Sequence, residues 1–204
     1  MTEARSDLDL LGAWRAGDAA AGQALFGRHF RRIYRFFETK CQAEADELVQ
    51  GTFLALMKAK DQFRGDSSFT TYLFAVARRE LYRVLELRRR DGARLDFGVS
   101  SIAELAPTPR TQMAGREDRM RLLHALQDLP VEQQTLLELH YWEGVEIADL
   151  AEIFESPAVT IRSRLHRARA ALRDRMMQEP NATAAIGDTL ETLDAWARRL
   201  APAQ

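Results

Sequence analysis

Apolar residues recur every three or four positions along most of the chain, which is the spacing of helices that bury one side. A short helical pattern lies within residues 7–22 and ends at Ala16-Gly17-Asp18, and a second helix is predicted over residues 18–39. Further helices are expected after residue 43, from about residue 68, over residues 116–129 and 131–142, around 145–154, and from Pro157 onward. The pattern therefore predicts an all-α fold.

The second and third of these helices carry long apolar stripes. The stripe of the second helix is mostly aromatic, which is more often a core than a cofactor site; it consists of Phe26, Phe30, Ile33, Tyr34 and Phe37. The residues of the third helix expected to point inward are Leu48, Val49, Phe53, Leu54, Leu56 and Met57. Its early turns keep Asp46, Glu47 and Gln50 outside, and acids in a first turn favour the helix dipole.

Residues 142–172 have the pattern of two helices joined by a tight turn near Glu155. Ser156 is expected to cap a helix that begins with Pro157. The buried stripe of that helix is Ala158, Ile161, Leu165, Ala168 and Leu172, which leaves outside Thr160, Arg162, Ser163, Arg164, His166, Arg167 and Arg169. Such donors suit phosphates and guanine edges, so we predict a helix-turn-helix with this second helix as the recognition helix. The alternative is a surface helix whose arginines are only solvated.

The helix predicted from residue 68 combines aromatic residues near its start with arginines along its later turns. These arginines are Arg78, Arg79, Arg83, Arg88, Arg89, Arg90 and Arg94. Rings that stack on bases and cations that follow the backbone are used to bind single-stranded nucleic acid. The alternative, with the aromatics in the core and the arginines solvated, stays open at this point.

Two segments interrupt the compact helical pattern. Residues 91–115 contain glycines and prolines without a sustained stripe, and we expect a flexible linker there. After a break at Glu179-Pro180-Asn181, residues 179–204 carry a last amphipathic pattern that needs a surface to cover. This tail is expected either to have a regulatory role or to extend the core of the second domain.

Composition and charge narrow the class of protein. The chain is 46% hydrophobic and 29% charged with a formal net charge of −1, and no apolar run approaches the roughly 20 residues that span a bilayer. We therefore expect no membrane insertion. The first residues lack the basic and then apolar pattern of an export signal, so export is not expected. Because Cys41 is the only cysteine, we expect a reduced cytoplasmic setting. No metal-ligand spacing, phosphate loop or catalytic motif stands out, so neither a cofactor nor an enzymatic activity is expected. Arginines and acids are concentrated in different segments, which predicts separate partners.

Several stretches, in this order, resemble one known family. These are ADELVQGTFL (residues 45–54), FRGDSSFTTYLFAVAR (residues 63–78), Leu129-Pro130 and the helix-turn-helix pattern over residues 142–172. Together they are similar to the two conserved parts of bacterial RNA polymerase sigma factors of the extracytoplasmic-function (ECF) type. The resemblance covers roughly residues 7–177.

The resemblance implies two small helical domains and a division of labour between them. Residues 1–90 would bind core polymerase and read and melt the −10 element, 91–115 would be the linker, 116–178 would read the −35 element, and 179–204 would be an extension. The residues implied to dock on the clamp of the β′ subunit are Asp46, Glu47, Leu48, Gln50 and Phe53. Those implied at the −10 element are Arg64, Asp66, Ser67, Ser68, Phe69, Tyr72, Arg78, Arg79 and Arg83. Those implied at the −35 duplex are Thr160, Arg162, Ser163, Arg164, His166 and Arg167.

The expected partners are therefore core RNA polymerase and promoter DNA, with an anti-sigma factor as a further candidate. The sequence departs from the usual family pattern at Tyr72 and Phe74, where tryptophan and tyrosine are usual, at Glu155 and Val159, where glycine is common, and at Glu146, where a serine cap is usual. Two other functions explain part of the motif set: a stand-alone helix-turn-helix regulator that binds DNA as a dimer, and an adaptor that occupies the polymerase without reading DNA.

Overall fold

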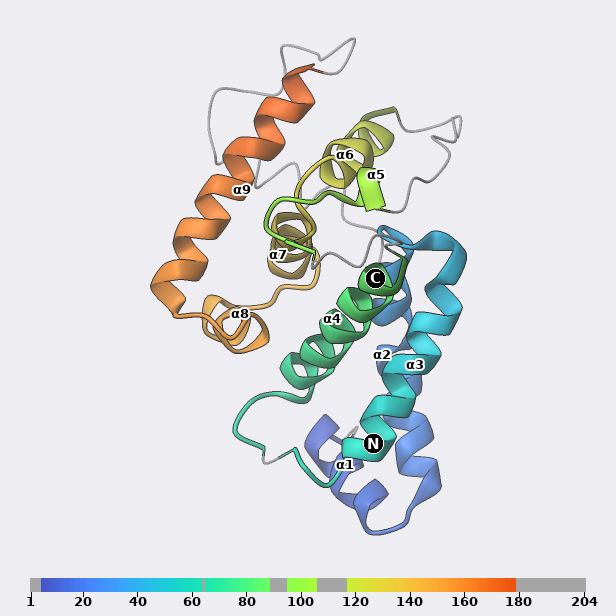
Figure 1. Cartoon of the computed structure of the whole chain (residues 1–204). Helices are drawn as coiled ribbons and strands as arrows, with labels where there is room; N and C mark the ends of the chain where they lie inside the picture. Colours follow the sequence, from blue (N-terminus) through green and yellow to red (C-terminus); the bar gives the residue numbers. More distant parts are fainter. Residues whose placement is uncertain (1–4, 64, 89–94, 106–116, 179–204) are drawn as a thin grey trace. The chain divides into compact units, whose positions relative to one another are not determined.

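The computed structural model of the chain describes residues 5–63, 65–88, 95–105 and 117–178 (Figure 1). Within these ranges the regular structure is helical, and the only bridge of β type joins Ser101 to Pro130. The chain divides into two compact units, Met1–Val84 and Leu85–Gln204. In the described ranges, no helix has the length and apolarity to cross a membrane. The amphipathic helix predicted in residues 179–204 lies outside the described residues.

The first unit is built from helices whose starts and ends follow the predicted pattern. They are α1 (Asp7–Arg15), α2 (Ala19–Glu38), the 3₁₀ turn η1 (Gln42–Glu44), α3 (Ala45–Ala59) and α4 (Phe69–Arg88), the last of which continues past Val84. Ser6 and Asp9 form a capping box at α1, and the Asp18 side chain accepts from the Ala21 N–H at the start of α2. These caps explain why Gly17-Asp18 separates two helices instead of continuing one.

A close contact between Trp14 and Gly22 sets how α1 lies on α2. A Cβ atom added to Gly22 would meet Cδ1 of the Trp14 indole at 2.6 Å, closer than real carbon contacts allow. The indole also packs edge-on against Phe26, with ring centroids 5.0 Å apart. Glycine is therefore needed at position 22 because the aromatic ring occupies the space where any other residue would place its Cβ.

Asp7 provides a second connection between α1 and α2. Its carboxylate accepts from Nη1 of Arg28 at 2.5 Å, and its other oxygen lies 2.7 Å from Nε2 of His29. Since a carboxylate only accepts, the proton of the imidazole is on Nε2. Burial lowers the pKa of His29, although Asp7 acts in the opposite direction, so the histidine is neutral at pH 7 and joins the helices by a hydrogen bond.

The core of the first unit confirms part of the predicted stripes and corrects the rest. Ile33 and Phe37 of α2 and Leu48, Val49 and Leu56 of α3 are buried. The prediction that Leu54 and Met57 point inward was wrong, since these side chains are 47% and 49% exposed, and Phe30 is 44% exposed. A three-to-four spacing identifies one side of a helix, but α3 carries apolar residues on two sides.

The second unit contains α5 (Ile102–Leu105), α6 (Glu117–Gln127), α7 (Val131–Tyr141), α8 (Ile147–Ile153) and α9 (Ala158–Gln178). Helices α6, α7 and α8 all pack against α9. Gln134 and Thr135 of α7 are buried beside its leucines, and the Gln134 amide donates to Glu138 at 2.8 Å. The predicted helices over 116–129 and 131–142 are therefore present with slightly shorter bounds.

Residues 95–105 pack on the second unit, inside the stretch for which the sequence predicts a linker. The N–H groups of Val131 and Glu132 donate to the carbonyls of Ser100 and Phe97 at 2.9 and 3.0 Å. Pro130 provides no side-chain cap for α7, so these carbonyls satisfy N–H groups that a helix start leaves unpaired. Ile102 is 1% exposed. This segment caps α7, a role that periodicity alone does not reveal.

We expect Gly22→Ala to lower the free energy of unfolding by about 1–3 kcal/mol, because the added methyl group overlaps the Trp14 ring. Gly27→Ala is the matched control on the same helix, since nothing lies within 4 Å of its Cβ position. That control should raise the free energy of unfolding by about 0.5–1 kcal/mol. Urea unfolding followed by circular dichroism measures both, and similar values for the two variants would contradict the packing argument.

Candidate polymerase and nucleic-acid interfaces

The first candidate surface lies along one side of α3. Asp46, Glu47 and Gln50 are exposed there, as the sequence predicts. Phe53 is half-buried, with its ring 4.6 Å from that of Phe26. Leu48 is only 2% exposed, so its side chain belongs to the core and not to this surface.

An apolar patch continues this surface toward the C-terminal end of α3. Residues 50, 53, 54 and 57 are spaced as one side of a helix, so Leu54 and Met57 extend the row that Gln50 begins. Phe30 of α2 belongs to the same patch, and its ring centroid lies 6.5 Å from that of Phe53. An exposed cluster of this kind is typical of a site that binds another protein. Sequence reasoning assigned these side chains to the core, and no signal in one sequence separates the two roles.

The second candidate surface begins in the loop between α3 and α4. Asp66 and Ser68 are exposed and Ser67 is half-buried, whereas Arg64 lies outside the described residues. Gly65 has φ +82°, a conformation that favours glycine. The Ser68 hydroxyl accepts from the Thr71 N–H at 3.0 Å and so caps α4. Phe69 is 2% exposed with its ring 5.3 Å from that of His29, so it packs in the core and has no open face for stacking.

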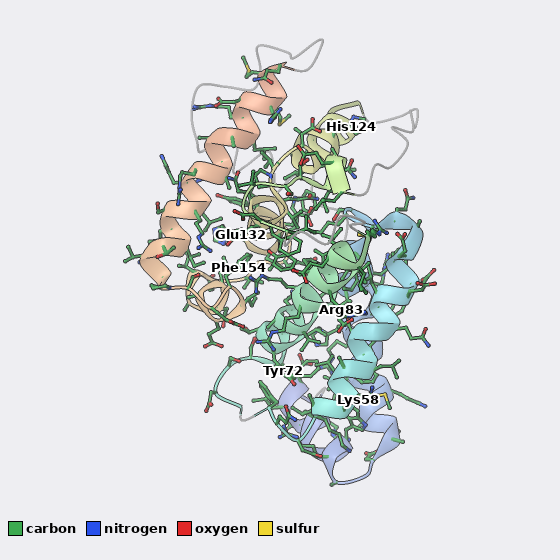
Figure 2. All side chains as sticks on the ribbon, viewed as in Figure 1. Lys58, Tyr72, Arg83, His124, Glu132 and Phe154 are labelled. Carbon is green, nitrogen blue, oxygen red and sulfur yellow. The ribbon has the colours of Figure 1, made fainter. Side chains whose placement is uncertain are left out.

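Tyr72 lies at the base of the same loop (Figure 2). Its hydroxyl donates to the Ala59 carbonyl at 3.3 Å, and its ring centroid lies 4.9 Å from that of Phe63. Burial raises the pKa of the phenol, which therefore stays protonated at pH 7. The ring is half-buried and connects the end of α3 to the first turn of α4.

The arginines that follow on α4 have different surroundings. Arg79 is exposed, and Arg78 is half-buried with its guanidinium 4.7 Å from the centroid of the Tyr82 ring. Arg83 donates to Glu80 one turn earlier, with Nη2 2.8 Å from the carboxylate (Figure 2). A carboxylate therefore competes with any phosphate for Arg83.

The third candidate surface is the exposed side of α9. Ile161, Leu165, Ala168 and Leu172 are buried as predicted, while Ala158 is half-buried. The exposed members of the predicted reading set are Arg162, Ser163, His166 and Arg167. Thr160 and Arg164 are half-buried. The helix thus presents two arginines, a hydroxyl and an imidazole opposite its buried stripe.

The turn before α9 adopts a left-handed conformation at Glu155. This residue has φ +51°, the only positive φ at a non-glycine residue in the described part of the chain. The Ser156 hydroxyl donates to the Phe154 carbonyl at 3.1 Å. The helix begins at Ala158, one residue later than predicted, and the Pro157 carbonyl accepts the first helical bond from Ile161 at 3.1 Å.

Arg164 is not directed outward like its neighbours, because its guanidinium forms an ion pair with Glu132 at the start of α7. The two side chains are 32% and 23% exposed, so the pair is partly shielded from water. Glu132 is in turn fixed by its N–H, which donates to Phe97. Further along α9, Arg169 donates to the Tyr141 hydroxyl at 3.1 Å. Both arginines connect α9 to α7.

Comparison with protein families gives two matches whose order follows that of the surfaces. Residues 25–92 match sigma-70 region 2, and residues 119–172 match sigma-70 region 4. The chain is a sigma factor of the ECF type. A sigma factor binds core RNA polymerase and directs promoter-specific initiation without catalysing a reaction, and this chain has that function.

Relatives and solved structures resemble this sigma factor along most of its length. The ECF RNA polymerase sigma-E factors of Escherichia coli (strain K12) and Salmonella typhimurium (strain LT2) are each 26% identical over 181 residues, covering 84% of this chain and 95% of theirs. The sigma-E factor of Haemophilus influenzae is 26% identical over 186 residues, which cover 86% of this chain and 98% of that protein. CnrH in complex with the cytosolic domain of CnrY has a similar fold, with a TM-score of 0.64 at 22% identity over 86% of this chain and all of that one. The sigma factor RpoE of Bartonella quintana, in complex with the anti-sigma factor NepR, has a TM-score of 0.56 at 26% sequence identity. The match covers 74% of this chain and 92% of that one.

The left-handed turn of this sigma factor gives a direct test. We expect Glu155→Gly to raise the free energy of unfolding by about 1 kcal/mol, because glycine adopts φ +51° without the steric cost of a Cβ. Glu152→Gly, in the right-handed helix α8, is the control and should lower the free energy of unfolding by about 1 kcal/mol. Chemical denaturation measures both changes, and a loss of stability in both variants would show that Glu155 is not strained.

Proposed function

We propose that the two units divide promoter recognition between them. The first domain, residues 1–90, docks on the polymerase and reads the −10 element, and the second, residues 116–178, binds the −35 element as duplex. Residues 91–115 connect them, with 97–100 bonded to the start of α7, and 179–204 form an extension. The observation that carries this proposal is the exposed side of α9, where Arg162, Ser163, His166 and Arg167 stand opposite a buried apolar stripe. The order of the region 2 and region 4 matches supports it.

For polymerase docking, we propose the exposed side of α3. Asp46, Glu47, Gln50 and Phe53 would meet the clamp of the β′ subunit, while Leu48 acts from the core by holding the helix in place. The apolar patch of Phe30, Leu54 and Met57 would add contact area beside the acidic end. An acidic and apolar surface of this kind can combine charge steering with hydrophobic burial.

For the −10 element, we propose that the loop between α3 and α4 reads bases of the opened strand. Asp66, Ser67 and Ser68 supply polar groups there, and the family resemblance adds Arg64. Phe69 and Tyr72, in the first turn of α4, would hold the end of the loop in place: Phe69 lies in the core and Tyr72 is half-buried. Arg78, Arg79 and Arg83 would follow the phosphates; Arg79 and Arg83 are exposed and Arg78 is half-buried.

For the −35 element, we propose that the exposed donors of α9 enter the major groove. Arg162, Ser163, His166 and Arg167 would contact bases and phosphates, with Thr160 near the helix start. Arg164 would contribute by fixing α9 against α7 through Glu132, or would exchange that carboxylate for a DNA phosphate. We also propose that the protein acts in the cytoplasm and that an anti-sigma factor is a partner, as the similar sigma factor RpoE is found in complex with the anti-sigma factor NepR.

The proposed function is tested by reconstitution with core RNA polymerase and a promoter library, followed by sequencing of transcript ends. We expect transcripts from promoters that share a −35 and a −10 element. A folded chain that binds core polymerase but yields no promoter-directed transcript would instead support a polymerase-binding adaptor. A palindromic footprint in the absence of polymerase would support a dimeric regulator.

Substitutions on α9 separate the roles of its arginines. We expect Arg162→Ala and Arg167→Ala each to weaken −35 binding by about 1–3 kcal/mol if they contact base edges. Arg164→Ala should cost less, because this arginine is already held by Glu132. Glu132→Gln should strengthen DNA binding, because it frees the Arg164 guanidinium to bind a phosphate. The slope of log affinity against log salt concentration should then steepen by about one unit.

Fluorescence anisotropy with a −35 duplex, at several salt concentrations and with single-base variants, measures these effects. A uniform loss over all duplexes would assign Arg162 or Arg167 to phosphate contact. A loss for Arg164→Ala as large as that for Arg167→Ala, with no gain for Glu132→Gln, would contradict the proposed role of the ion pair.

A further inference from the structure

We infer that Arg15, the last residue of α1, positions the loop between α3 and α4 and so sets how sharply the protein discriminates among −10 sequences. The inference rests on the proposed role of that loop in −10 recognition. Arg15 lies outside the stretch that matches sigma-70 region 2, which begins at residue 25. We treat it as a positioning residue, because its guanidinium is bound to the loop backbone.

The guanidinium of Arg15 joins two backbone carbonyls of the loop. Its Nε donates to the Lys60 carbonyl at 2.8 Å, and its Nη2 donates to the Phe63 carbonyl at 2.5 Å and also to that of Lys60. The guanidinium carbon lies 5.9 Å from the centroid of the Phe63 ring. The planar fork of an arginine can bind two acceptors at once, and a lysine ammonium does not reproduce that geometry.

These two carbonyls are places where the loop needs an external donor. Lys60 is the C-terminal cap residue of α3, where carbonyls have no partner within the helix and a positive charge is favourable. Among the described loop residues after Lys60, Phe63 alone is buried, whereas Asp61, Gln62, Gly65 and Asp66 are exposed. The loop therefore has almost no core of its own, and Arg15 provides contacts that hold its backbone.

The connection between α1 and the loop is reciprocal. Lys60 extends its ammonium toward α1, where it lies 5.3 Å from the centroid of the Trp14 ring. Trp14 is fixed by its contact with Gly22 of α2. Tyr72 of α4 holds the same end of the loop, since its hydroxyl donates to the carbonyl of Ala59, the residue before Lys60. Arg15 and Tyr72 thus hold the start of the loop from two helices, and the exposed Asp66 and half-buried Ser67 follow in the same loop.

A purely stabilising contact and a positioning contact predict different outcomes. If Arg15 only stabilises the fold, its removal lowers the free energy of unfolding and reduces transcription equally on all promoters. If it positions the loop, its removal lets the polar groups at 66–68 adopt several arrangements, so favoured and unfavoured −10 sequences are used more equally. Selectivity is therefore the decisive measurement, because overall activity changes in both cases.

The experiment uses full-length protein with core polymerase, on a promoter recovered by transcript sequencing and on versions with single −10 substitutions. We compare Arg15→Ala, Arg15→Gln and Arg15→Lys with wild type. Arg31→Ala is the control, since it removes one exposed positive charge from the neighbouring helix α2. Urea unfolding and core-polymerase affinity are measured in parallel.

For Arg15→Ala and Arg15→Gln we expect the ratio of transcription from the parent promoter to that from its −10 variants to fall about tenfold, as for loss of one charge-assisted hydrogen bond. Arg15→Lys should restore part of this ratio, because an ammonium reaches one carbonyl but not the fork. Arg31→Ala should keep the wild-type ratio. If Arg15→Ala does not fold, the comparison of Arg15→Gln with Arg15→Lys decides the question.

The inference is overturned if the Arg15 variants keep wild-type discrimination while Asp66→Ala or Ser67→Ala lowers it. It is also overturned if activity falls by the same factor on every promoter. If instead Asp66→Ala and Ser67→Ala leave −10 discrimination unchanged, the proposed role of the loop itself fails. The two failures are thus distinguished in the same set of reactions.

Discussion

Each helix of this sigma factor can bury one side, so the residues on its remaining sides are those that partners can reach. On α9 the buried stripe of Ile161, Leu165, Ala168 and Leu172 leaves an exposed side rich in donors. On α3 the same constraint has a different result, because apolar residues continue onto the exposed side as Leu54 and Met57. The chemistry left outside, cationic on α9 and acidic and apolar on α3, suits DNA and protein partners respectively.

The arginines of this protein fall into groups according to what already binds them. Arg15 is held by backbone carbonyls, Arg83 by Glu80 and Arg164 by Glu132, whereas Arg162 and Arg167 are exposed. A phosphate must displace the existing partner of a held arginine, and the lost interaction reduces the gain from the new one. Counting arginines along a helix therefore overestimates the number that contribute to DNA affinity, and the held ones contribute to the shape of the reading surfaces.

Local pattern was sufficient to predict the helices from α1 to α9 that carry sustained stripes, because three-to-four spacing and caps such as Ser6 and Asp18 are encoded within one turn. It did not predict the capping of α7 by residues 97–100, since that depends on contacts between segments about thirty residues apart. It also did not predict α5, whose four residues are too few to show a periodic stripe although Ser101 and Glu104 cap its start. The Glu132–Arg164 pair was missed for the same reason. The position of Leu48 in the core and of Met57 outside could not be decided, because α3 is apolar on more than one side.

Both proposed reading surfaces depend on turns that are shaped by residues outside the surfaces themselves. In the first unit the loop before α4 combines Gly65 at positive φ with backbone carbonyls held by Arg15. In the second unit the turn before α9 has Glu155 at positive φ, and the helix that follows is held by Glu132. Discrimination between similar sequences requires donors fixed to within a fraction of an ångström. Substitution of these supporting residues is therefore expected to change promoter specificity as well as substitution of the side chains proposed to face the DNA.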